Sequence, residues 1–154
     1  MVKWRPKVAA GLGTSLEKFF TDTPVPKRRA MVLEGLRGEV MSFQVAYAAN
    51  YRGAVEMTVS GPASDWTTAR RVNLAHVEHP TYGCPPEERE RPSPGFFPDP
   101  LMPEAEYRCF PEQTRAVWFT VRIPAEAKAG PARLKARVTA AGKTVADLGV
   151  TVTV

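Results

Sequence analysis

The 154-residue sequence predicts an all-β fold, namely an antiparallel β-sandwich of immunoglobulin-like architecture with roughly seven to nine strands. Apolar and polar residues alternate in several stretches, as they do when one face of a strand is buried and the other is solvated. The chain also holds 15 prolines and 11 glycines, which in a β-patterned sequence mark many turns and long loops. This length and composition indicate one globular domain, residues 1–154, with a hydrophobic core.

The N-terminal part predicts little regular structure before the first strand. Residues 1–29 form an irregular lead-in, in which residues 15–20 (SLEKFF) predict a single helical turn capped by Thr14 or Ser15. The run DTPVP that follows favours an extended linker, because each residue before a proline is pushed out of the helical region. We therefore expect the first strand to begin at Ala30.

Two alternating segments follow in the first half of the chain. Residues 41–47 and residues 55–59 each place apolar side chains at every second position. The segment NYRG at residues 50–53 lies between them and contains the glycine that a turn favours. We predict that these two strands form a hairpin.

Residues 70–79 resume the alternation, but the apolar positions change face after Leu74, which predicts a bulge or burial on both sides. From residue 80 to residue 111 the periodicity disappears, and this stretch holds nine of the prolines. A proline-rich loop of this length is usually functional or part of an interface. Its aromatic residues should pack on the sandwich or on a neighbouring domain, and we expect one of these to cover the sheet face that carries Trp118.

The clearest strands lie at the C-terminal end, where residues 117–123, 134–138 and 148–154 alternate between apolar and polar. Pro124 ends the first of them because it removes a ladder donor, and residues 140–143 (AAGK) predict a hairpin turn between the other two. The last strand runs to the final residue. We expect from this that the sequence is a fragment of a larger protein.

Composition excludes several classes of partner. The sequence has no apolar run of the ~18 residues that a membrane-spanning helix needs, and no signal peptide at its start. The net charge of +5 is spread along the chain, and its basic residues are not interleaved with stacking aromatics, so no nucleic-acid partner is predicted. The sequence leaves the compartment open and favours an extracellular or cell-surface location.

The two cysteines, Cys84 and Cys109, lie in the same irregular region and leave two possibilities open. A disulfide between them would close a loop of about 25 residues and contribute roughly 3 kcal/mol on the chain-entropy view. Two free thiols are the alternative. A zinc site is not expected, because only His76 and His79 accompany the cysteines and no paired CxxC occurs. No phosphate-binding loop or nucleophile elbow occurs either, so no cofactor is predicted.

No residue is assigned a catalytic role, because sequence cannot establish the separation of carboxylates that glycoside hydrolysis requires. Aromatic side chains on a β-sandwich can instead stack on sugars or contact a neighbouring domain. Trp4 is one tryptophan of this kind. The other candidate carbohydrate-binding or interface residues are Trp66, Tyr82, Phe96, Phe97, Asp99 and Trp118.

Three motifs carry a family resemblance. They are LRGEVMSFQVAY beginning at Leu36, PDPLMP beginning at Pro98 and VWFTVRIPAEAKAG beginning at Val117. Their order and spacing resemble those in the N-terminal β-sandwich domain of bacterial proteins similar to glycoside hydrolase family 123. The resemblance covers the chain from about Ser15 to its end and departs from the family pattern at Ala132, where a bulky aromatic residue is expected.

The resemblance implies a parent protein in which a following barrel performs substrate-assisted hydrolysis of N-acetyl-galactosaminides and the sandwich packs against it. The catalytic acids of such proteins belong to the barrel, so none is carried over to this chain. We therefore predict a non-catalytic N-terminal accessory and docking domain whose partner is the following catalytic domain. Two alternatives stay open: an autonomous carbohydrate-binding module that uses Trp66 and the loop aromatics, and an adhesion or assembly domain that pairs through an exposed edge strand.

Overall fold

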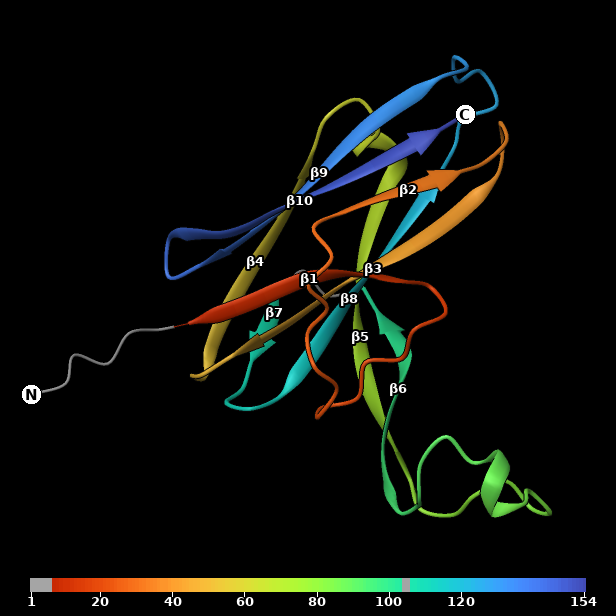
Figure 1. Ribbon diagram of the computed structural model, residues 1–154, viewed down its shortest axis with the longest axis vertical. Coiled ribbons are helices and arrows are strands. Elements are labelled where there is room, and N and C mark those ends of the chain that lie inside the picture. The colour runs from red at the N-terminus through yellow and green to blue at the C-terminus, as the bar shows by residue number, and fades with distance from the viewer. Residues whose placement is uncertain (1–6, 104–105) are drawn as a thin grey trace, which may run out of the picture.

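The protein is a sandwich of two five-stranded sheets, as a computed structural model shows for residues 7–103 and 106–154 (Figure 1). The predicted all-β sandwich is confirmed. Residues 1–6, which include Trp4 and the start of the predicted lead-in, lie outside the described residues, as do residues 104 and 105. Among the described residues, no helix has the length and apolar character needed to cross a membrane.

Ten strands and two short 3-10 helices follow one another along the described chain. They are β1 (Val8–Thr14), β2 (Ala30–Glu34), β3 (Val40–Ala49), β4 (Gly53–Ser60), η1 (Ser64–Trp66), β5 (Thr67–Val77), η2 (Pro86–Glu88), β6 (Gly95–Met102), β7 (Tyr107–Cys109), β8 (Thr114–Arg122), β9 (Pro131–Ala140) and β10 (Lys143–Thr153).

The first sheet, called sheet A, has the strand order β1-β3-β8-β5-β6, and the second, sheet B, has the order β2-β10-β9-β4-β7. All strand pairs are antiparallel except β2 with β10, which run parallel. A parallel pair needs a long crossover, and the chain between β2 and β10 supplies one by passing through both sheets. The expected antiparallel arrangement is therefore correct except at this edge of sheet B.

The core lies between the sheets and is built from the inward-facing positions of the alternating strands. Phe43 of β3 and Phe119 of β8 are fully buried, and their rings stack with centroids 4.9 Å apart. Sheet B contributes aliphatic side chains such as Leu134, Val138 and Leu148. The predicted C-terminal strands β8, β9 and β10 thus supply much of the core, as the alternation indicates.

The predicted hairpin between residues 41–47 and residues 55–59 is wrong, because the two strands belong to different sheets. Strand β3 lies between β1 and β8 in sheet A, whereas β4 pairs with β9 and β7 in sheet B. The chain crosses from one sheet to the other at residues 50–52. A period of two is the same in both arrangements, so the alternation cannot distinguish a hairpin from a crossover.

The predicted irregular lead-in is also wrong in part, because it contains β1, which pairs with β3 along its whole length. The free edge of β1 is covered by a later part of the lead-in, where the Leu12 amide donates to the Arg28 carbonyl at 2.9 Å. Gly11 makes this approach possible, since a Cβ at that position would lie 1.8 Å from the Pro26 carbonyl oxygen. The edge is thereby closed to pairing with another strand.

The predicted helical turn at residues 15–20 is replaced by a non-helical turn. In this turn the Glu17 carboxylate accepts the Thr14 backbone amide at 2.5 Å, which is a different contact from the predicted cap by a Thr14 or Ser15 side chain. The helix does not continue because Phe19 and Phe20 are both buried, and Phe19 packs on the outer face of sheet A against Ala46, Val72 and Ala116. Tertiary burial of two adjacent aromatic rings therefore outweighs the local preference for a helix.

Strand β3 is buried on both of its faces along most of its length for this reason. On the outer face, the buried Gln44 side chain donates to the Thr14 and Glu17 carbonyls at 2.9 and 2.7 Å. Trp118 on the neighbouring strand is half-buried and packs against the cluster around Phe19. The outer face beside Trp118 thus carries a small apolar cluster that includes Phe19 of the lead-in, which the sequence did not lead us to expect.

The predicted loop from residue 80 to residue 111 is shorter than expected, because it contains β6 and β7. Strand β6 forms one edge of sheet A, where prolines such as Pro98 and Pro100 are tolerated because their missing N–H groups need no partner on the open side. Its register with β5 shifts between Val72 and Leu74, where two steps along β5 face three along β6 from Pro98 to Leu101. The extra residue therefore lies in β6, and the predicted bulge in β5 after Leu74 is not found. Residues 78–94 form the long connection between β5 and β6, and we call them the tip loop.

Removing the Phe19 ring should destabilise the protein by about 3 kcal/mol, because it empties the small core on the outer face of sheet A. Urea unfolding of Phe19→Ala, followed by tryptophan fluorescence, measures this change. Leu16→Ala is the matched control, since Leu16 lies in the same turn and is 92% exposed. Equal stability of the two variants would contradict the assignment of a second core.

Candidate functional site

The candidate residues do not converge on one site. Trp66 lies in η1 at the start of β5, whereas Tyr82, Phe96 and Phe97 lie beyond or beside the other end of that strand. Since β5 has 11 residues, these two groups are separated by roughly 33 Å. Trp66 is half-buried and packs against the main core. The structure therefore brings only part of the predicted set together.

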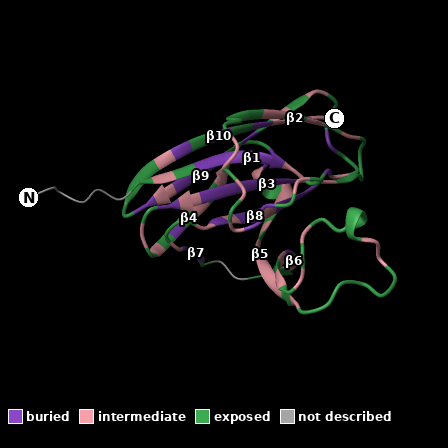
Figure 2. Cartoon of the chain, turned by 60° about the horizontal axis from the view of Figure 1, so that its bottom comes forward, coloured by how far each residue is buried: buried purple, intermediate pink, exposed green. Residues whose placement is uncertain are grey.

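Phe97 and Asp99 meet at a cavity of about 320 Å³ between the tip loop and the strands β5 and β6. We call it the tip cavity. Figures 1 and 2 show the tip loop projecting beyond the sandwich, with most of its surface exposed. The other lining residues are Lys18, Ala75, Val77, Pro80, Thr81, Cys84, Arg89, Glu90, Arg91, Ser93 and Pro98.

The tip loop is tied to the sandwich through the lead-in segment. Arg91 donates two hydrogen bonds to the Asp22 carboxylate, at 2.9 and 2.5 Å, and its guanidinium lies 3.9 Å from the centre of the Phe20 ring. Phe20 in turn packs edge-on against Phe97, with ring centroids 5.6 Å apart. Lys18 pairs with Glu90 as well. These contacts hold one wall of the tip cavity in place.

Two candidate aromatic residues lie on the surface near the tip cavity and do not line it. Tyr82 is fully exposed, and Phe96 is 59% exposed. The Phe96 ring contacts the His76 ring on the neighbouring strand, with centroids 5.3 Å apart. These side chains are available to a partner, and their role in carbohydrate or domain binding stays a prediction.

The two cysteines are free thiols, so the disulfide considered from sequence does not form. Cys84 is half-buried in the tip loop next to sheet A, whereas Cys109 is buried in β7 at the edge of sheet B. The Cys109 thiol lies 3.4 Å from the Gly53 carbonyl oxygen. Within residues 7–103 and 106–154, no three His, Cys, Asp or Glu side chains gather closely enough to hold a metal ion.

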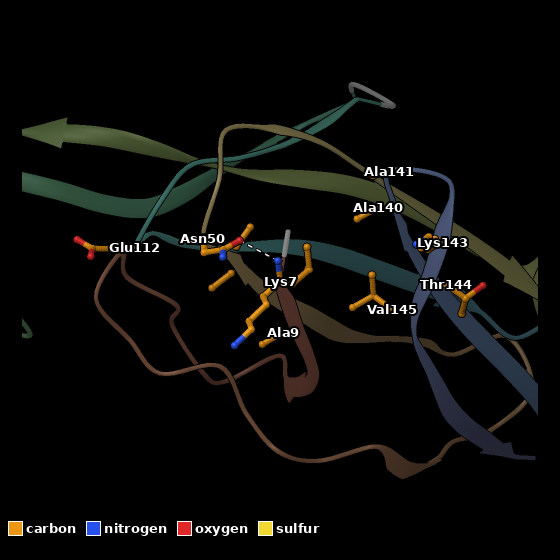
Figure 3. Close-up of a pocket in the computed structure, with 12 residues that line it drawn as sticks. Lys7, Ala9, Asn50, Glu112, Ala140, Ala141, Lys143, Thr144 and Val145 are labelled. Carbon is orange, nitrogen blue, oxygen red and sulfur yellow. Dashed lines mark hydrogen bonds between the residues drawn. The ribbon is translucent and has the colours of Figure 1, made fainter. Parts of the chain in front are cut away.

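A second hollow, which sequence reasoning missed, lies at the end of the sandwich where β1 begins (Figure 3). This end recess has a volume of about 850 Å³ and is open to solvent. Its apolar lining comes largely from small residues, including Ala9, Ala140 and Val145, with Lys7, Glu112 and Lys143 among its polar members. Alanines at strand ends give no sequence signal, because they also suit the interior of any strand.

Backbone contacts at the first described residue define one side of the end recess. The Lys7 amide donates to the Asn50 side-chain oxygen at 2.8 Å, and the Asn50 amide donates to the Lys7 carbonyl at 3.1 Å (Figure 3). Glu112 lies on the neighbouring connection, where its amide donates to the Ala49 carbonyl at 3.3 Å. The recess thus lies among strand ends that hydrogen bonds hold together.

Comparison with known proteins finds similarity in fold only. No protein-family model matches the chain, and a search of curated proteins finds no match. Among solved structures, the chain is similar to a family 123 glycoside hydrolase from Clostridium perfringens, described in connection with glycolipid glycan hydrolysis, with a TM-score of 0.72. The match has 14% sequence identity and covers 96% of this chain but only 27% of the hydrolase. The chain therefore shares its fold with one part of the hydrolase.

Because both thiols are free but differently buried, we predict that an alkylating reagent labels the two cysteines at different rates. Under native conditions Cys84 should be labelled first, because Cys109 is buried in β7. Mass spectrometry of peptides from the labelled protein measures the order, and unfolding should expose both thiols. A reductant should leave the melting temperature unchanged. A protein that takes up label only after reduction would contradict the free-thiol assignment.

The Arg91–Asp22 contact predicts that acid loosens the tip loop. The hydrogen bond from Arg91 lowers the pKa of the Asp22 carboxyl from its usual 3.8. A carboxyl with a lowered pKa stabilises the folded state above its usual pKa, and this contribution is lost as the pH falls through the lower value. Hydrogen exchange near Arg91, corrected for its intrinsic pH dependence, should therefore accelerate as the pH falls below 3.8.

Substitution separates this local effect from general acid unfolding. Asp22→Asn should show the faster exchange already at neutral pH. Asp147→Asn, which breaks the similar pair of Arg137 and Asp147 on sheet B, should leave the tip loop unaffected. Protection of the tip loop that does not change in Asp22→Asn would show that the pair does not anchor it.

Proposed function

We propose that this chain is a non-catalytic accessory domain that precedes and docks onto the catalytic domain of a longer glycoside-hydrolase-like protein. The observation that carries the proposal is the fold match, in which nearly the whole chain corresponds to about a quarter of a much larger hydrolase. The three sequence motifs support it independently, because they resemble the sandwich domain of such proteins. The substrate would be a glycan, and the partner would be the catalytic domain of the same protein.

Two polar residues of the first motif, Glu39 and Gln44, support a non-catalytic role, because they bind the protein's own backbone. The Glu39 carboxylate accepts the Leu36 amide at 2.7 Å, and the Gln44 side chain binds two carbonyls under the lead-in segment. The Ile123 amide donates to the Glu39 carbonyl at 2.9 Å, which joins the first motif to the third. Groups engaged in this way stabilise the sandwich and are not free to contact a substrate.

The end recess is the surface we assign to docking. Large apolar hollows on a folded domain commonly mark interaction sites, and interfaces between domains of one chain are partly polar. The recess combines an apolar floor with charges of both signs, from Lys7, Lys143 and Glu112. It is wide and open, which suits side chains of a neighbouring domain. The catalytic domain is the occupant we propose.

Activity provides the first test. A chromogenic N-acetyl-galactosaminide should not be turned over by this chain alone, whereas the full product of the gene should hydrolyse it or a related glycoside. The measurement is release of the chromophore above a blank without enzyme. The non-catalytic assignment would be overturned if the chain alone turned over the substrate and Asp99→Asn abolished this activity. A reading frame that encodes no further domain would also overturn it.

Calorimetry of the full gene product provides the test of docking. Ala9→Arg places a large charge at the end recess and should uncouple the unfolding of the sandwich from that of the catalytic domain. Each kcal/mol of lost coupling should lower the melting temperature of the sandwich by about 2–4 °C. Ala30→Arg, at an exposed position in β2, is the matched control. Identical melting of the two variants would exclude the end recess as the docking surface.

A further inference from the structure

The tip cavity has the size and rigidity of a small-molecule site. Ligand pockets in proteins run from about 300 to 1,000 Å³, so a cavity of about 320 Å³ suits a ligand of one or two sugar rings. One wall is apolar and includes Val77, Phe97 and Pro98. The Phe97 ring is held by its edge-on contact with Phe20, which lies under Arg91. This wall is formed before any ligand arrives, so little ordering would be required on binding.

The cations that line the cavity are already engaged. Arg89 donates to the Cys84 carbonyl at 3.2 and 2.8 Å, Arg91 binds Asp22, and Lys18 pairs with Glu90. An anionic ligand would have to break one of these contacts. A cationic ligand is also disfavoured, because cations outnumber carboxylates three to two in the lining. The electrostatics therefore favour a neutral ligand.

Asp99 is the lining carboxylate that remains available. It is exposed, and among the described residues none forms a hydrogen bond or ion pair with its side chain. Ionised carboxylates accept hydrogen bonds through both oxygens, which matches two adjacent hydroxyl groups of a polyol. Thr81 and Ser93 add hydroxyl groups to the same lining. The polar part of the site thus favours a ligand rich in hydroxyl groups.

We propose that the tip cavity binds a neutral sugar, either free or at the end of a glycan. Asp99 accepts hydrogen bonds from its hydroxyl groups, and the apolar face of the ring packs against Phe97 and Pro98. A pyranose ring has one apolar face and a rim of hydroxyl groups, so it meets both walls at once. This inference does not rest on the docking function, because the tip cavity and the end recess share no lining residue.

Titration of the chain with neutral monosaccharides, followed by amide chemical shifts, tests the inference. Galactose, N-acetylgalactosamine and glucose are the probes, and at least one should bind with a Kd of about 1 mM. The shifted amides should lie in β5, the tip loop and β6. Asp99→Ala should weaken binding by about tenfold or more, because hydrogen bonds to a charged group are lost.

Asp65→Ala is the matched control, since Asp65 is also an exposed aspartate but lies in η1 at the far end of β5. It should leave the Kd unchanged. Failure of all three sugars to bind, or binding that Asp99→Ala does not weaken, would overturn the inference. Tighter binding of glucuronate or glucosamine than of the neutral sugars would do the same. The docking proposal is tested separately, because chromophore release and domain melting in the full gene product do not depend on whether the tip cavity binds a sugar.

Discussion

The pairing of β3 with β8 at the centre of sheet A is the constraint on which the rest of the structure depends. The stacked rings of Phe43 and Phe119 fill the core on one side of this pair. On the other side, Ala46 and Ala116 are buried as well, so the pair requires a second apolar cover. Phe19 supplies this cover, and the carbonyls beside it bind Gln44. The lead-in segment is thereby fixed across the outer face of sheet A.

This arrangement also positions the tip loop. Because Phe19 is held on sheet A, the neighbouring residues Lys18, Phe20 and Asp22 are presented to the loop, where they contact Glu90 and Arg91. The tip cavity is therefore built from four stretches: the lead-in, strand β5, the tip loop and strand β6. The sequence motifs that resemble a hydrolase family serve the sandwich, whereas the tip cavity lies beside the edge strand β6 and the end recess lies where β1 begins.

The strands of the sandwich could be predicted where alternation was undisturbed, as in β8, β9 and β10. Two features of the sequence concealed other strands. Pro98 and Pro100 interrupt β6, which forms only because an edge strand tolerates missing donors. The small residues of β1 carry no clear alternation, and four consecutive residues of that strand are buried. Assignment of β3 and β4 to different sheets was also beyond reach, since alternation specifies a buried face and not a partner strand.

The site shows the same division between local and tertiary information. The sequence by itself determined that aromatic and acidic residues gather near the proline-rich stretch, and it thereby identified Phe97 and Asp99. Only the tertiary structure decided that these two share a cavity while Trp66 lies at the other end of β5. It also decided that Cys84 and Cys109 remain unbonded. The reason is physical: residue type is a local property, whereas distance between side chains depends on which strands pair and on what covers the sheets.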